Sequence, residues 1–214
     1  MLLVLQNIQA LTSFFADTNG KISWKNSTNW QTSIDFCSWH GVTCDTARDV
    51  VGISLRGNGL TGRLSESLEF LPKLKFLDLS NNTFETKLKA ICAVRSLEIF
   101  SIQDSNVNFE LPDCLCDMPN LKVLDVTGNN IIGNIPKCLK LDSLFIECNE
   151  IMDEIENNEI KELSFGCNTD VIVDYNAFKG VLTGSCTCKD TNNCQKVYKG
   201  RCGKYVHEGQ FSDE

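Results

Sequence analysis

A pattern of apolar residues and asparagine recurs along the middle of this 214-residue chain at a nearly constant step. Each copy reads apolar, any, apolar, two of any kind, Asn, any, apolar, and the first four copies are separated by 24, 23 and 24 residues. Two shorter copies follow at steps of 20 and 19 residues. A fixed step of this kind predicts a repeat protein whose stacked units share one core. The copies open at Ile53, Leu77, Phe100, Leu124, Leu144 and Leu163, with a further partial copy predicted at Val171.

Each copy begins with a short stretch in which apolar residues alternate with others, which is typical of a β-strand with one buried face. A single such strand cannot bury that face, so we expect neighbouring copies to pair in parallel and to merge their apolar positions into a continuous core. The asparagine is expected to satisfy backbone groups where each strand turns away. In the third copy Ser105 replaces it, and we expect the adjacent Asn106 to substitute there.

Two longer segments point to a known class of repeat. Asn58–Leu64 reads N-G-L-T-G-R-L, and Asn129–Pro136 reads N-N-I-I-G-N-I-P. These segments resemble the N-x-L-x-G-x-I-P motif of plant-type leucine-rich-repeat proteins, including those of algae and related protists. The resemblance implies an α/β fold, a curved leucine-rich-repeat solenoid with a parallel β-sheet on its concave side. We expect an N-terminal cap at 1–49, repeats at 50–178 and a Cys-rich C-terminal cap or tail at 179–214.

The N-terminal flank has the features of a cap. A helix is predicted over residues 5–16, because its apolar residues recur at helical spacing and would cover the first strand. Residues 37–44 read C-S-W-H-G-V-T-C and resemble the C-x-W-x-G-V-T-C signature of the plant-type cap. We therefore expect a disulfide between Cys37 and Cys44, with Trp39 packed beneath it. A zinc site is the alternative, although only His40 is near enough to add a ligand. The helix residues assigned to the buried side are Leu5, Ile8, Leu11, Phe14 and Phe15.

The chain has twelve cysteines, an even number that favours disulfides and an oxidising compartment. Equivalent positions in adjacent copies should lie about one strand spacing apart, ~4.8 Å, so offsets within the copies predict partners. On this basis we pair Cys148 with Cys167. On the convex side we predict Cys92 with Cys116 and Cys114 with Cys138.

The C-terminal tail holds four more cysteines in a segment with little apolar content. We expect two disulfides there, in one of three pairings that the sequence does not separate. A four-thiolate zinc site is the alternative, although the spacing lacks paired C-x2-C units. The four cysteines are Cys186, Cys188, Cys194 and Cys202.

Charge and hydropathy limit the partners and the location. A net charge of −8 disfavours binding to nucleic acid or to anionic lipid. No apolar run reaches 18 residues, so we expect no membrane span, while an anchor outside this chain stays open. Residues 2–5 are too short for the apolar core of a secretion signal, so we expect the chain to be trimmed. Glycosylation sequons at Asn26 and Asn81 agree with a secreted or cell-surface protein.

The residues between the apolar strand positions should point outward and form the recognition surface of the solenoid. Aligned apolar residues among them suggest a protein or peptide ligand, although a plain solvated face is the alternative. We expect no cofactor and no resident metal. The predicted ligand-binding residues are Ser54, Arg56, Phe76, Asp78, Ser80, Ser101, Gln103, Val123, Asp125, Thr127, Phe145 and Glu147, and Ile99, Glu162 and Ser164 share the same face.

An acidic run follows in the shorter copies, from Glu147 to Glu162. A solvated face is the simplest interpretation, and attraction of a basic partner or of calcium is the alternative. The two histidines lie in opposite flanks, at 40 and 207, and the motifs of hydrolases, zinc proteases and kinases are absent. We therefore expect no enzyme but an extracellular recognition module, either receptor-like or adhesive. A secreted inhibitor of a glycosidase or other hydrolase and a structural cell-wall or surface-coat protein are the alternatives.

Overall fold

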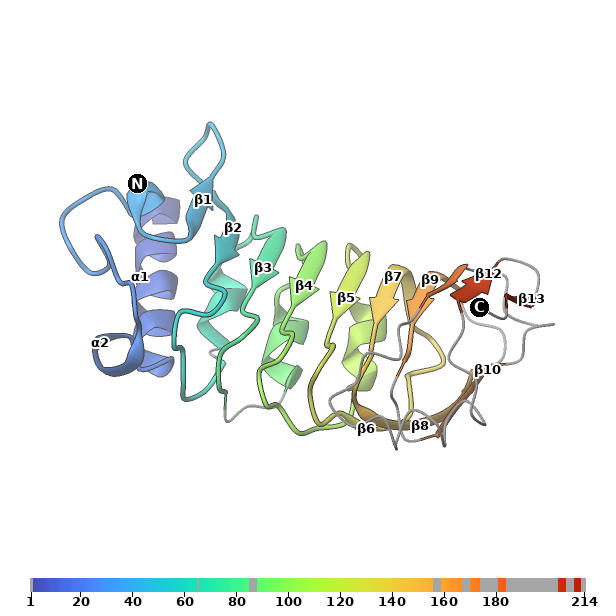
Figure 1. The fold of residues 1–214 in the computed structure, drawn as a ribbon. Coiled ribbons are helices and arrows are strands. Elements are labelled where there is room, and N and C mark those ends of the chain that lie inside the picture. Colours follow the sequence, from blue (N-terminus) through green and yellow to red (C-terminus); the bar gives the residue numbers. More distant parts are fainter. Residues whose placement is uncertain are drawn as a thin grey trace.

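The chain folds into an elongated solenoid with a long parallel sheet along one side (Figure 1). The computed structural model describes residues 2–64, 66–84, 88–155, 159–166, 170–173, 181–183, 204–206 and 210–212. The main sheet has the order β1-β2-β3-β4-β5-β7-β9-β11, and only the β1–β2 pair is antiparallel. The predicted fold class is therefore confirmed. These strands are β1 (Val42–Cys44), β2 (Val50–Ser54), β3 (Phe76–Asp78), β4 (Ile99–Ser101), β5 (Val123–Asp125), β7 (Lys140–Phe145), β9 (Glu159–Ser164) and β11 (Val181–Thr183).

A second, smaller parallel sheet runs along the lateral side of the solenoid, in the order β10-β8-β6. Its strands are β6 (Ile132–Gly133), β8 (Glu150–Ile155) and β10 (Asp170–Val173). The partial copy predicted at Val171 is thus wrong, because that segment pairs with β8 and not with the main sheet. The main sheet continues instead at β11, which pairs with β9. A separate hairpin joins β12 (Lys204–Val206) and β13 (Gln210–Ser212).

Helices lie on the side opposite the main sheet and at the N-terminal end (Figure 1). Three short 3₁₀-helices, one in each of three successive copies, lie on the convex side. The helices are α1 (Leu2–Asp17), α2 (Gly20–Ser23), η1 (Phe36–Ser38), η2 (Glu66–Phe70), η3 (Leu88–Ala93) and η4 (Asp113–Asp117).

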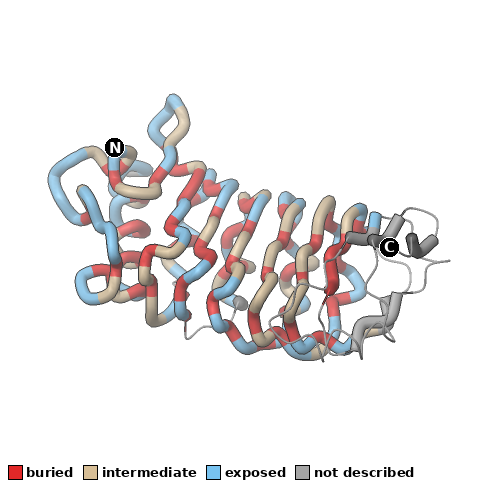
Figure 2. Tube along the Cα trace, viewed as in Figure 1, coloured by how far each residue is buried: buried red, intermediate tan, exposed pale blue. Residues whose placement is uncertain are grey.

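The core is one continuous stack of the predicted apolar positions (Figure 2). The opening residue of each copy is in register with the next, and each is fully buried. This alignment follows from the two-residue period of a strand, which puts alternate side chains on one face. The stacked residues are Ile53, Leu77, Phe100, Leu124, Leu144 and Leu163.

Asparagine side chains bind the backbone between copies, as predicted. Nδ2 of Asn82 donates to the carbonyls of Leu55 and Leu79 at 2.9 and 2.8 Å, while its Oδ1 accepts from the Leu60 amide at 2.9 Å. In the third copy the expectation for Asn106 is wrong, since that side chain is exposed. The Ser105 hydroxyl itself is buried and donates to the Gln103 carbonyl at 2.9 Å.

Helix α1 covers the N-terminal end of the core through one face. Buried residues at positions 7, 10, 11 and 14 follow the i, i+3, i+4, i+7 spacing of a single helical stripe. The prediction for Leu5 and Ile8 is wrong, because both lie off this stripe and are exposed. Beneath the helix, Trp24 and Trp30 pack edge to face with ring centroids 4.8 Å apart.

The predicted disulfide between Cys37 and Cys44 is confirmed, with a Cα–Cα distance of 5.5 Å. Since both sulfurs are in the bond, they are not available as zinc thiolates. Trp39 is buried beside this loop, and its Nε1 donates to the Ile34 carbonyl at 3.0 Å. The bond closes the cap onto β2, because Cys44 ends β1 and β1 pairs with β2.

The two convex disulfides differ from the prediction. The structure pairs Cys92 with Cys114 and Cys116 with Cys138, with Cα–Cα distances of 5.8 and 5.6 Å. The physical reason is the position of each cysteine relative to the buried residue of its turn, which is Ile91, Leu115 or Leu139. The residue after that buried side chain faces the next copy, and the residue before it faces the previous copy. Equivalent positions therefore do not meet, whereas positions before and after do.

Other predicted cysteine pairs are not covered by the structure. Cys148 is described and Cys167 is not, so their pairing stays a prediction. The same holds for the four cysteines of the tail at 186, 188, 194 and 202, which lie outside the described residues. None of the described helices combines the length and apolar character that a membrane crossing requires.

Candidate ligand-binding face

The outward side chains of the main sheet form three parallel rows. Strand register aligns the first row at Phe76, Ile99, Val123, Ser143 and Glu162. It aligns the middle row at Ser54, Asp78, Ser101, Asp125, Phe145 and Ser164. The third row lies two residues further along each copy, at Arg56, Ser80, Gln103, Thr127 and Glu147.

Most predicted residues of this face are accessible, but two are not. Ser80 is 0% exposed and Ser164 is 3% exposed. Ser80 is turned toward its neighbours, with its Oγ 2.8 Å from Ser101 Oγ and accepting the Gln103 amide at 3.1 Å. Ser164 donates its hydroxyl to Glu147. Neither serine can contact a ligand without breaking these bonds, so both support the face and do not form its surface.

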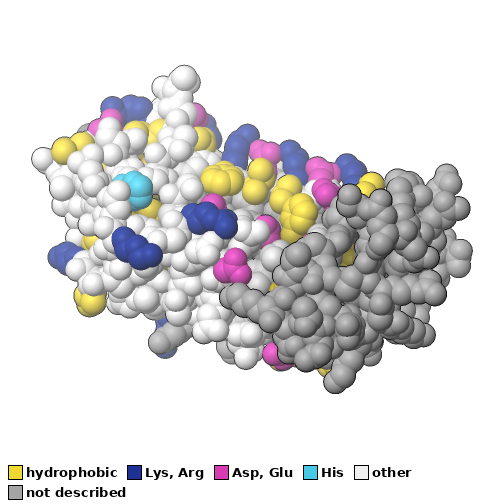
Figure 3. All heavy atoms as spheres, viewed as in Figure 1, with side chains coloured by type: hydrophobic (Ala, Val, Ile, Leu, Met, Phe, Trp, Pro, Cys, Tyr) yellow, Lys and Arg dark blue, Asp and Glu magenta, His cyan; other side chains and the backbone are white. Residues whose placement is uncertain are grey.

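The first row contains an apolar stretch across three strands, Phe76, Ile99 and Val123. Phe76 and Ile99 are each 38% exposed, and Val123 is half-buried. In Figure 3, hydrophobic side chains gather over β3, β4 and β5 on this side of the molecule. We call this stretch the apolar row. Its members are held one strand spacing apart by a hydrogen-bonded sheet, so the surface is pre-organised for contact with another molecule.

The third and middle rows are connected by a hydrogen-bond chain that crosses several copies. Arg56 Nη1 donates to Gln103 Oε1 at 2.9 Å, and Gln103 Nε2 donates to Asp125 Oδ2 at 2.6 Å. The Thr127 amide donates to Asp125 Oδ1 at 3.1 Å. Burial nevertheless raises the pKa of Asp125 above its ordinary value, against the lowering effect of these donors. A partly buried carboxylate of this kind is stabilised by a bound hydrogen-bond donor or cation that replaces its lost hydration.

The C-terminal half of the face carries two glutamates, Glu147 and Glu162. Glu147 accepts from Ser164, and Glu162 Oε2 accepts from Ser143 Oγ at 2.8 Å. Ion pairs among the described residues lie elsewhere and include no carboxylate of the three rows. These acids are therefore hydrogen-bonded by hydroxyl groups but not neutralised by lysine or arginine.

The lysines instead line the edge where the strands begin, in a ladder of alternating charge. Lys75 and Lys122 each contact Glu98, at 3.0 and 2.7 Å, and Lys161 contacts Asp142 at 2.5 Å. Basic and acidic side chains alternate along this edge in Figure 3. The two lysines lower the pKa of Glu98, and Glu98 raises the pKa of Lys122. We call this set the rim ladder.

The acidic run from Glu147 to Glu162 does not form one face. Its two ends point from the main sheet, whereas Glu150 and Asp153 belong to β8 in the lateral sheet. Asp153 Oδ2 accepts from the Ile135 amide at 2.8 Å, which gives it a structural role. Among the described residues, no three His, Cys, Asp or Glu side chains gather in an arrangement suited to a metal ion.

Both predicted glycosylation sites are on the surface. Asn26 is exposed, and its Oδ1 accepts from the amide and the hydroxyl of Thr28 at 3.0 and 2.7 Å. Asn81 is also exposed, at a positive φ of 56° just beyond β3. A glycan at either asparagine would therefore extend into solvent.

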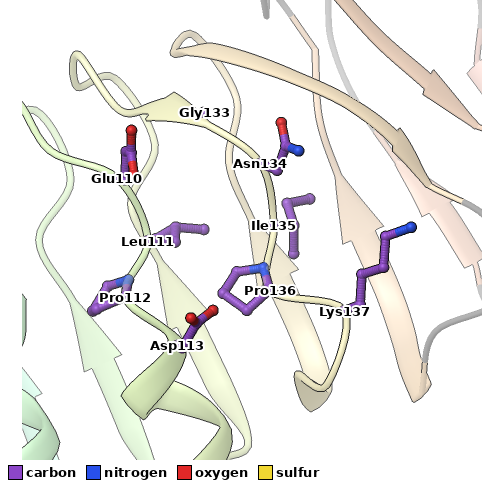
Figure 4. Close-up of a pocket in the computed structure, with 9 residues that line it drawn as sticks. All are labelled: Glu110, Leu111, Pro112, Asp113, Gly133, Asn134, Ile135, Pro136 and Lys137. Atoms are coloured by element: carbon purple, nitrogen blue, oxygen red, sulfur yellow. The ribbon is translucent and has the colours of Figure 1, made fainter.

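A groove of about 640 Å³ lies between the segments that leave the third and fourth copies. Figure 4 shows these two segments, 110–113 and 133–137, running beside each other with Pro112 and Pro136 among the lining residues. The charged side chains of the lining, Glu110, Asp113 and Lys137, are all exposed. Since the groove holds no buried polar group, it is a weaker candidate than the sheet face.

Comparison with known proteins agrees with this architecture. Residues 5–45 match the leucine-rich-repeat N-terminal domain, and residues 73–93 and 120–141 match the leucine-rich repeat. The chain is 30% identical over 138 residues to phytosulfokine receptor 1 of Arabidopsis thaliana, covering 63% of this chain and 11% of the receptor. It is 36% identical over 113 residues to receptor-like protein 49 of the same plant, covering 51% of this chain and 12% of that protein. The chain thus spans about a tenth of the length of these relatives.

Solved structures show the same fold. The ectodomain of the receptor kinase SOBIR1 from Arabidopsis thaliana superposes with a TM-score of 0.63 at 21% identity, over 78% of this chain and 95% of that chain. PEPR1 in complex with AtPEP1 gives a TM-score of 0.65 at 21% identity, over 84% of this chain and 29% of that chain. The matches place a leucine-rich-repeat N-terminal domain at residues 5–45 and leucine-rich repeats in the stacked copies, on a solenoid like those of plant leucine-rich-repeat ectodomains. In sequence the chain is similar to plant receptor-like proteins and receptor kinases.

Proposed function

We propose that this protein is an extracellular recognition module that binds a protein or peptide on the concave face of the main sheet. The observation that carries the proposal is the apolar row beside unneutralised carboxylates on a rigid, exposed sheet. An ordinary solvated strand face has no reason to align apolar side chains at successive register positions. Disulfides between described cysteines support a location outside the cell.

Related solenoids support a binding function but give no indication of the ligand of this chain. PEPR1 was solved with AtPEP1 and HAESA with a peptide hormone, which shows that solenoids of this fold bind peptides in those proteins. Matches to receptor kinases fall in the repeat region, so no kinase chemistry carries over to this chain. We therefore propose binding and not catalysis, with the outward residues of the three rows as the contact surface.

Two isoleucines offer a matched test of which face binds. Ile99 lies in the apolar row and is 38% exposed, whereas Ile132 lies on β6 of the lateral sheet and is 37% exposed. The same substitution, isoleucine to arginine, can be made at both positions with similar effects on folding. Each variant and the wild-type chain would be immobilised and exposed to one displayed library of random peptides of about twelve residues.

We expect Ile99→Arg to lose the peptides that the wild-type protein retains, since it places a charge in the apolar row. Ile132→Arg should retain them. Far-UV circular dichroism and thermal melting would establish that both variants are folded. Equal retention by both variants, or loss only in Ile132→Arg, would contradict the assignment of the concave face.

A further inference from the structure

Two parts of the concave face differ in chemistry and have a fixed separation. The apolar row lies on β3, β4 and β5. Next to it, Asp125 and Phe145 are register partners on β5 and β7. Thr127 and Glu147 follow two residues further along the same copies, so the four outward residues define a quadrilateral. Asp125 and Glu147 lie at the two ends of one diagonal of this quadrilateral, and Phe145 is adjacent to both. We call the set of four residues the acidic corner.

Neither carboxylate of the acidic corner forms an ion pair within the described part of the chain, and the charge of Arg56 acts on Asp125 only from a distance. Asp125 accepts from neutral donors, the Gln103 side chain and the amide and side chain of Thr127, and Glu147 accepts from Ser164. Arg56 is the one described cation in the three rows, and it lies on the first copy, bonded to Gln103. The lysines of the neighbouring copies are engaged in the rim ladder. A cation delivered by a ligand would therefore meet two carboxylates that form no ion pair with a lysine or arginine of the described residues.

We propose that the ligand of this face is an extended peptide that places apolar side chains on the apolar row and one lysine or arginine over Phe145, between Asp125 and Glu147. The inference rests on the proposed function of the face. The aliphatic stem of the basic residue would pack on the half-buried Phe145 ring, which also attracts a cation through its π-face. The charged head would then reach one or both carboxylates.

The strand spacing gives the length and pattern of this peptide. From β2 to β9 the sheet has five strand intervals, or about 24 Å, which an extended chain spans with roughly seven residues. Ile99 on β4 and Phe145 on β7 are separated by two intervals across the strands, about 10 Å, and by two residues along them, about 7 Å, which gives about 12 Å in all. The basic residue should therefore lie about three positions from an apolar residue, in peptides that cross the strands.

Selection from the same displayed library tests this pattern on the full chain. We expect the retained peptides to share a lysine or arginine about three positions from an apolar residue. For a synthetic peptide with that pattern, Glu147→Gln and Asp125→Asn should each weaken binding by roughly tenfold, because each removes one charge at a partly buried contact. The matched controls are Glu150→Gln in the lateral sheet and Asp113→Asn on η4, which should leave affinity unchanged.

The outcomes separate this inference from the proposed function. If retained peptides depend on Ile99 but show no preference for a basic residue, or bind equally to Glu147→Gln, the ligand chemistry is wrong and the concave-face function stands. If no peptide depends on Ile99, both are wrong. Glu147→Lys adds a direct check, since it should replace the basic preference by an acidic one, and an unchanged preference would also overturn the inference.

Discussion

Replacing Asn129 by leucine keeps the side-chain volume and should destabilise the protein more than the same change at the other described repeat asparagines, Asn58, Asn82 and Asn149. The Asn129 amide nitrogen donates to three carbonyl oxygens at 2.8 to 3.2 Å, and its oxygen accepts the amides of Ser105 and Val107 at 3.0 and 3.2 Å. The side chain is 6% exposed, so water cannot replace these bonds easily. The amide nitrogen has two hydrogens, so its three donor contacts count as about two bonds. With the two accepted bonds, and at about 1 kcal/mol per net hydrogen bond, the loss amounts to about 4 kcal/mol.

Two further variants make this prediction specific. Asn129→Ser copies the residue that the third copy has at position 105, where the hydroxyl still reaches backbone groups, so about half of the loss is expected. Asn130→Leu alters the adjacent partly exposed side chain, whose single bond goes to Asn106, and should cost less than about 0.5 kcal/mol.

The free energies of unfolding would be obtained from urea titrations followed by circular dichroism. Hydrogen exchange would locate the effect, which should centre on the amides of Ser105 and Val107. If Asn129→Leu differs from Asn130→Leu by less than about 1 kcal/mol, the hydrogen bonds of Asn129 do not carry the stability assigned to them. The same conclusion would follow if exchange changed evenly along the whole chain.

Three other perturbations have defined outcomes. Cys92→Ser should release the thiol of Cys114 and no other, as located by alkylation and fragment-ion mass spectrometry. The double variant with serine at both Cys92 and Cys114 should lose about 3 kcal/mol of stability in urea unfolding, because the bond closes a 22-residue separation. Glu98→Gln should lower the urea midpoint at neutral pH, because the folded pKa of this exposed carboxylate is depressed by its lysine partners. The difference from wild type should disappear as pH falls below about 4.5, and it should shrink in high salt. Asp125→Asn should be at least as stable as wild type at pH 7, because burial raises the folded pKa of this carboxyl. Any stability advantage of the variant should decline as pH falls toward 3.8. A pH series of thermal melts would reveal or refute this trend.

Local periodicity predicted the stacked parallel strands and the core, and the resemblance to the plant-type motif implied the fold class. A two-residue alternation at a constant step buries the apolar side of every copy when the copies stack in parallel. For the same reason the sequence predicted the outward rows. Of the twelve residues predicted to bind a ligand, from Ser54 to Glu147, Ser80 is the one that is buried.

Features that depend on direction between copies were not predictable from offsets alone. The convex disulfides required knowledge of which way Cys114 and Cys116 point from the buried Leu115, and the sequence does not state the phase of a 3₁₀ turn. The lateral strand at 170–173 looks like a further copy because its apolar residues also alternate. The burial of Ser80 likewise depends on a hydroxyl contact with Ser101 in the next copy.

The rim ladder has a consequence for how such a chain can gain or lose copies. Its charges alternate as Lys75, Glu98, Lys122, Asp142 and Lys161 along successive copies, so each side chain is matched only to the sign of its immediate neighbours. Removing one internal copy would bring two lysines or two carboxylates together, whereas removing two adjacent copies would keep the alternation. A duplication or deletion of copies in pairs is therefore compatible with this edge, whereas a change by one copy leaves two like charges side by side.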